Sequence, residues 1–139
     1  MTARSLIFGI PGNPALRTGG YIYDRRLAEG LRARGWAVSR MALDDTFPQP
    51  TDGALRAADA AYASLGDGTL VLTDGLAFGA MPEVAARHAD RLRLVALVHH
   101  PLGYETGLPP ARAADLVRSE RAALTTARAV LVTSETTRR

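Results

Sequence analysis

The sequence contains no cysteine and no lysine. Without cysteine, disulfides and thiolate metal sites are excluded. All 17 basic residues are therefore arginine, and against 14 acidic residues they leave a net charge of +3. Two of these arginines are the last two residues, Arg138 and Arg139. No basic stripe interleaved with aromatic residues is present, so we do not expect nucleic-acid binding.

Long apolar runs are also missing. No run reaches the roughly 18 residues of a membrane-spanning helix, and the N-terminus lacks a signal-peptide pattern. With 139 residues, of which 47% are hydrophobic, the chain is expected to form one soluble, cytoplasmic domain with a real core. Peripheral contact with a membrane stays open, although no strongly amphipathic cationic helix stands out.

Short apolar runs alternate with helical patterns along the whole chain. Continuous Leu, Val and Ile runs are typical of parallel strands that are buried on both faces. Short connections between alternating strands and helices predict a Rossmann-like, doubly wound α/β domain, with about five strands and helices on both faces. The expected strands are 5–10, 37–43, 69–75, 92–100 and 129–134, and the expected helices are 21–34, 54–65, 82–90 and 110–127.

Glycine and polar residues gather at one edge of the predicted sheet. In open α/β sheets, ligands bind beyond the carboxyl ends of the strands. The residues that follow the strands are Gly12, Gly19 and Gly20 after the first, Asp74 and Gly75 after the third, His99 and His100 after the fourth, and Ser134 after the fifth.

The pair Gly19 and Gly20 stands where a loop becomes a helix. Free N–H groups at a helix start favour an anion, and a phosphate can approach a residue without a Cβ closely. A tight turn with a helix cap explains the same pair without a ligand. The spacing matches neither G-x-G-x-x-G nor a Walker A loop.

His99 and His100 end the fourth predicted strand. Successive strand residues point to opposite sides, so one of the two is expected to face a cleft. Such a histidine could donate a hydrogen bond to a substrate or act as an acid or base, or it could be structural. The third histidine, His88, is predicted to be a packing or surface residue. No metal site is expected from these histidines.

Three acidic residues have structural explanations. Asp24 is predicted to lie in the first turn of a helix, where it complements the helix dipole. Glu120 falls within an apolar helical stripe, so it needs a salt bridge or a backbone contact. Glu105, with Tyr104, belongs to the loop "GYETGLPP", which either lines a substrate cleft or merely connects a strand to a helix.

Four segments in this order are similar to a known family. They are "RTGGYIYDRRLAEGLRARGWAV", "DGLAFG", "LVALVHHPLGYETGL" and "SERAALTTARAVLVTSETTRR". Together they cover nearly the whole chain, and they resemble the N-terminal half of a GT-B glycosyltransferase close to the family 4 group. The glycine pair, the His-x-Pro step and the final run are each only moderately specific, but their order and spacing strengthen the match.

The resemblance implies a retaining enzyme built from two Rossmann-like domains. In such enzymes the N-terminal domain binds the acceptor, and the C-terminal domain binds a nucleotide-sugar donor. The resemblance implies that the enzyme needs no metal or other cofactor. Gly19 and Gly20 look like the loop that meets the donor diphosphate. His99 looks like the histidine near the reacting sugar, although His100 departs from the residue that often follows. Asp74, Gly75, Tyr104 and Glu105 are expected to line the acceptor side of the cleft.

The last residues resemble the start of another helix, with Ser134 as its N-cap. We therefore expect the chain to be a fragment that lacks the donor-binding domain and has little activity alone. A non-catalytic Rossmann-like module, or a stand-alone remnant that acts with a partner, is the alternative. A hydrolase is a weaker interpretation, because no G-x-S-x-G elbow occurs.

Overall fold

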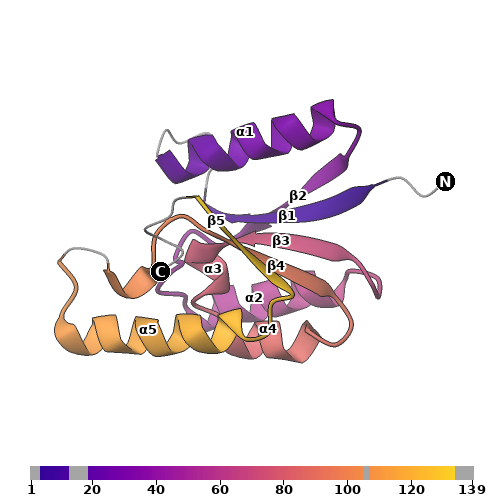
Figure 1. The fold of residues 1–139 in the computed structure, drawn as a ribbon. Coiled ribbons are helices and arrows are strands. Elements are labelled where there is room, and N and C mark those ends of the chain that lie inside the picture. Colours follow the sequence, from indigo (N-terminus) through magenta and orange to yellow (C-terminus); the bar gives the residue numbers. More distant parts are fainter. Residues whose placement is uncertain (1–3, 13–18, 105–106, 134–139) are drawn as a thin grey trace.

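The computed structural model describes residues 4–12, 19–104 and 107–133. Its strands form one sheet in the order β2-β1-β3-β4-β5, and every neighbouring pair is parallel. This arrangement confirms the predicted α/β class and the five-stranded parallel sheet (Figure 1). The strands are β1 (Ser5–Pro11), β2 (Ala37–Leu43), β3 (Leu70–Asp74), β4 (Arg93–Val98) and β5 (Ala129–Val132).

Helices cover both faces of the sheet, as predicted. In Figure 1, α1 lies on one face, and α2, α4 and α5 lie on the other. From β1 the chain moves outward to β2, and then it returns to place β3 on the other side of β1. The strand order therefore reverses between β1 and β3, which is where ligands bind in such folds. The helices are α1 (Gly19–Ala33), α2 (Asp52–Ala63), α3 (Gly75–Phe78), α4 (Pro82–His88) and α5 (Pro110–Leu124), with a 3₁₀ helix, η1 (Leu102–Tyr104).

Two short elements, α3 and η1, were not predicted, because segments of four and three residues carry no usable periodicity. Helix α3 begins where β3 ends, since the Asp74 carboxylate accepts a hydrogen bond from the Leu76 amide at 2.9 Å. Gly75 packs directly on β4. A Cβ at this position would lie 3.0 Å from the Leu97 carbonyl oxygen, so the close approach favours glycine.

The prediction that the strands are buried on both faces is correct for the central strands and wrong for the edges. Strands β1, β3 and β4 are mostly buried, whereas β2 and β5 each have one neighbouring strand and are largely exposed. Val130 and Leu131 of β5 are 40% and 45% exposed. Beside Leu131, an apolar groove of about 270 Å³ runs along the α1 face of the sheet. It is lined by Leu6, Leu27, Leu31, Leu70, Leu72, Val95, Ala129 and Leu131.

The larger core cluster lies between the sheet and helices α2 to α5, and a smaller one lies under α1. Tyr62 of α2 is fully buried in the larger cluster, and its hydroxyl is 2.6 Å from the Thr73 hydroxyl of β3. This hydrogen bond satisfies two polar groups that water cannot reach. In the part of the chain that the structure describes, no helix has both the length and the apolar character needed to cross a membrane.

The Tyr62–Thr73 hydrogen bond can be tested with a double-mutant cycle. Tyr62→Phe leaves the buried Thr73 hydroxyl without this partner and should lower the free energy of unfolding by about 1–3 kcal/mol. Adding Thr73→Val removes both polar groups and should recover part of that loss. Urea denaturation measures each variant. A Tyr62→Phe protein as stable as the parent would contradict this account.

Candidate functional site

Two buried carboxylates and one histidine meet at the carboxyl edge of the sheet. The His99 Nε2 atom lies 2.8 Å from Asp24 Oδ1 and 3.4 Å from Asp74 Oδ2. Asp24 and Asp74 are 0% and 1% exposed, whereas the His99 side chain is 20% exposed. Only the histidine of this group therefore has appreciable contact with the surface.

Three separate elements position these side chains. His99 directly follows β4, and Asp74 is the last residue of β3, so adjacent parallel strands bring them to the same edge. Asp24 comes from α1, on the face that packs toward the sheet. The prediction that Asp24 lies in the first helical turn is wrong. The helix begins at Gly19, which puts Asp24 in the second turn, where it pairs with His99 instead of the helix dipole.

The two carboxylates change the proton affinity of His99. Burial alone would lower the pKa of His99, but the hydrogen bonds and charges of Asp24 and Asp74 outweigh it and raise the pKa to about 9. The two carboxylates therefore favour the protonated, imidazolium form of His99.

The carboxylates themselves differ. Burial raises the pKa of Asp24 to about 7, despite the hydrogen bond from His99. Burial also acts to raise the pKa of Asp74, but hydrogen bonds with His99, Asp24 and the Leu76 amide lower it overall.

Two tyrosines of α1 surround the cluster. The Tyr23 ring meets the His99 ring edge-on, with centroids 5.3 Å apart and planes at 73°. Burial, together with the charges of Asp74, Asp24 and Asp45, raises the pKa of Tyr21. A Cβ on Gly12, which follows β1 with φ of +70°, would lie 2.8 Å from the Tyr21 hydroxyl. The turn after β1 therefore favours glycine for its backbone angle and for the space beside Tyr21.

His100 lies away from this cluster. It is exposed and close enough to Glu120 of α5 to lower the pKa of that carboxyl, although burial raises it overall. Glu120 Oε2 accepts a hydrogen bond from the Leu102 amide at 3.3 Å, which confirms the predicted backbone contact. Of the two adjacent histidines, the structure joins His99, and not His100, to the buried acids.

His88 is also part of a hydrogen-bond network, but on the other face of the sheet. Its Nε2 atom is 2.8 Å from Asp59, its Nδ1 atom is 3.3 Å from Arg91, and its ring meets Tyr62 edge-on. His88 is buried among these partners. The predicted packing role is confirmed.

The remaining residues singled out in the sequence are more scattered. Gly19 and Gly20 form the first turn of α1, and Gly75 is buried against β4. Tyr104 is exposed in η1. Glu105 and Ser134 lie outside the described residues.

Sequence analysis did not connect Asp24 or Asp74 with His99, and it considered metal binding only through the histidines. In the described residues, one ligand atom from each of these three side chains lies within 4.8 Å of the others. Two carboxylates and an imidazole could hold a divalent cation. A cation would have to displace the proton between His99 and Asp24, so metal binding and the observed hydrogen bond exclude each other.

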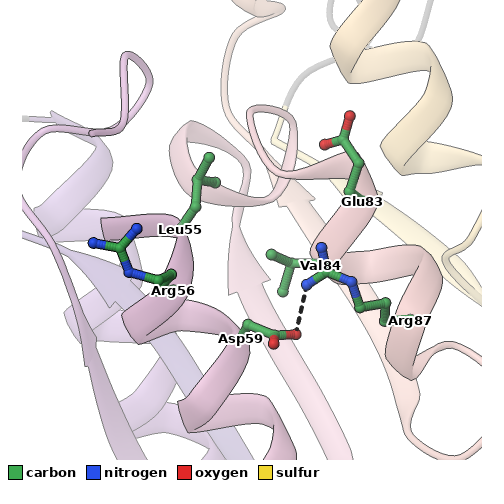
Figure 2. Close-up of a pocket in the computed structure, with 6 residues that line it drawn as sticks. All are labelled: Leu55, Arg56, Asp59, Glu83, Val84 and Arg87. Atoms are coloured by element: carbon green, nitrogen blue, oxygen red, sulfur yellow. Dashed lines mark ion pairs between the residues drawn. The ribbon is translucent and has the colours of Figure 1, made fainter. Parts of the chain in front are cut away.

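A separate cavity of about 220 Å³ lies between α2 and α4. Figure 2 shows its lining residues, Leu55, Arg56, Asp59, Glu83, Val84 and Arg87. Arg87 is paired with Asp59 at 3.0 Å, and Glu83 adds a second negative charge. This cavity therefore has no strong preference for a ligand of one charge, and none of the site residues predicted from the sequence lines it.

No protein-family model matches the chain, and no curated protein matches its sequence. The resemblance to glycosyltransferases therefore remains a prediction from sequence motifs.

The raised pKa of His99 predicts how folding stability depends on pH. Because the folded pKa of about 9 exceeds the ordinary value of 6.5, the stabilisation is complete below pH 6.5 and is lost as the pH rises through 9. The free energy of unfolding should fall by about 3 kcal/mol between pH 6 and pH 9.5. Urea denaturation at the two pH values measures it.

A His88→Gln variant is the control for this measurement. It should show the same difference between the two pH values, because His88 does not belong to the Asp24–His99–Asp74 cluster. Equal stability of the parent at pH 6 and pH 9.5 would refute the assigned proton affinity.

Proposed function

We propose that the chain is the acceptor-side domain of a retaining glycosyltransferase that uses a nucleotide-sugar donor, and that its donor-binding domain is a separate part of the protein. The observation that carries this proposal is a cationic histidine, His99, held by two buried carboxylates at the carboxyl edge of a doubly wound sheet. Three of the four sequence segments that resemble the family contain the three cluster residues, Asp24, Asp74 and His99.

The start of α1 lies close to the cluster. Gly20 is four residues before Asp24, so the two share a helix face about 6 Å apart along the axis. The amide groups in the first turn of a helix favour an anion. A diphosphate at this helix start would therefore lie near the positive charge of His99.

These groups suit the charge that sugar transfer creates. The bond from the sugar C1 to the diphosphate oxygen breaks, a C1–oxygen bond to the acceptor hydroxyl forms, and the hydroxyl proton passes to the diphosphate. Negative charge develops on the leaving diphosphate, and fixed donors and cations at that point accelerate the reaction. His99 and the first turn of α1 provide such groups in this domain.

The two histidines provide the test. In a protein that carries this domain together with the donor-binding domain, His99→Gln should lower kcat for sugar transfer about 100-fold. His100→Gln should lower it less than about tenfold, since His100 lies outside the buried cluster. Release of nucleoside diphosphate from a panel of nucleotide-sugars, with and without acceptors, measures the rate.

Equal rates for the parent and the His99→Gln variant would reject the assignment of His99. If the complete protein released no nucleoside diphosphate from any donor of the panel, a non-catalytic binding module would be the better description.

A further inference from the structure

The cluster holds two carboxylates for a single histidine. Asp24 and Asp74 are both buried, and the Oδ2 atom of each has no hydrogen-bond partner among the described residues. A buried carboxylate is costly unless its charge is neutralised. One imidazolium can neutralise one carboxylate, so the second requires another positive charge or a proton.

Geometry favours a proton between the two acids. Oxygen atoms of both carboxyl groups and the His99 nitrogen lie within 4.8 Å of one another, and the two acids are close enough for a hydrogen bond when one is protonated. Paired carboxyls that share one proton are known wherever two like charges cannot both ionise.

The local environment decides which acid keeps the proton. Asp74 also accepts a hydrogen bond from the Leu76 amide at the start of α3, which stabilises its ionised form. Asp24 Oδ1 contacts His99 at 2.8 Å, and no backbone amide in the described part of the chain donates to Asp24. The proton therefore belongs to Asp24, with Asp74 ionised.

We propose that Asp24 and Asp74 are positioning residues that share one proton and hold His99 as an imidazolium in a fixed orientation. His99 then meets its ligand as a cationic hydrogen-bond donor and not as a base, because an imidazolium has no lone pair to accept a proton. The inference that this ligand is the donor's diphosphate rests on the proposed glycosyltransferase function. The protonation state itself does not.

The titratable groups that the structure describes around His99 come from two elements. Asp24, Tyr21 and Tyr23 belong to α1, and Asp74 ends β3. The neighbouring His100 lies close enough to Glu120 on α5 to lower the pKa of that carboxyl. Tyr21 is neutral at physiological pH, since its surroundings raise its pKa further above 10. The two carboxyls therefore dominate the charge around His99.

Nuclear magnetic resonance of this chain, with a chelator present, tests the protonation state directly. At pH 7 both ring nitrogens of His99 should carry protons, and the ring should titrate near pH 9. Asp24→Asn and Asp74→Asn should each lower that midpoint by about one pH unit or more, because each removes a negative charge beside the ring. A neutral His99 ring at pH 7 in the parent would overturn the proposal.

Asp59→Asn is the matched control. Asp59 contacts His88 at the same 2.8 Å distance that joins Asp24 to His99. This substitution should leave the His99 midpoint unchanged. A shift of the His99 midpoint as large as that caused by Asp24→Asn would show a general charge effect and overturn the specific role of the pair. The parent measurement decides the proposal even if one variant fails to fold.

Activity separates this inference from the proposed function. In the two-domain protein, the rate should fall as the pH rises through the His99 midpoint, and Asp24→Asn should move that fall to lower pH. Suppose that Asp24→Asn shifts the titration midpoint of His99 but does not shift the pH dependence of activity. That result would reject the role of His99 in sugar transfer, but the proposal of a proton shared by the two acids would stand. A neutral His99 ring at pH 7 in an enzyme that still transfers sugar would reject the shared proton, but the proposed glycosyltransferase function would stand.

Discussion

The hydrogen bond between His99 and Asp24 joins residues 75 positions apart in the chain, at the carboxyl edge of the sheet. Helix α1 covers one face of the sheet, and this bond ties its second turn to the end of β4 (Figure 1). A buried charge can persist only where its partner is held in place. This contact therefore links the charge of His99 to the position of α1, which the apolar cluster beneath the helix also holds over the sheet.

Two neighbouring strands of the sheet fix the positions of Asp74 and His99 in this cluster. Asp74 and His99 follow strands that are neighbours in register, with Asp74 paired to Leu97 across the sheet. Helix α3 begins at once after Asp74 and fixes that carboxylate through the Leu76 amide. Gly75 allows β3 and β4 to remain close at this point, because a side chain there would meet the β4 backbone. The local backbone geometry of β3, α3 and β4 thus sets the distance between the Asp74 carboxylate and the His99 ring.

Much of the fold was predictable from the sequence, and the central strands show why. Continuous apolar runs in 5–10 and 92–100 leave few alternatives to buried parallel strands. The same reasoning placed His99 and Asp74 at the correct edge. The edge strands were less predictable, because β5 has an apolar sequence, yet Val130 and Leu131 are exposed. Burial depends on what covers a strand, and a local apolar pattern does not report it.

The role of Asp24 could not be read from its local sequence. An acidic residue near a helix start has a ready explanation in the helix dipole. Its actual partner is determined by how α1 is rotated about its axis and by where β4 ends, and both are tertiary features. A helical wheel that begins at Gly19 would place Asp24 one turn below Gly20 and one turn before Ala28, which is buried. A carboxylate on that inward stripe was the available signal.

The adjacent histidines show how one sequence motif divides into two functions. Both lie in the bend that follows β4, which ends at Val98, and their side chains meet different groups. His99 contacts two buried acids, which raise its pKa, whereas His100 lies near Glu120, which also accepts a hydrogen bond from the Leu102 amide. Because Glu120 fixes the backbone just after His100, the segment cannot rotate to exchange the two rings without losing that bond. Contact with the two buried acids therefore belongs to His99, and His100 lies outside that cluster.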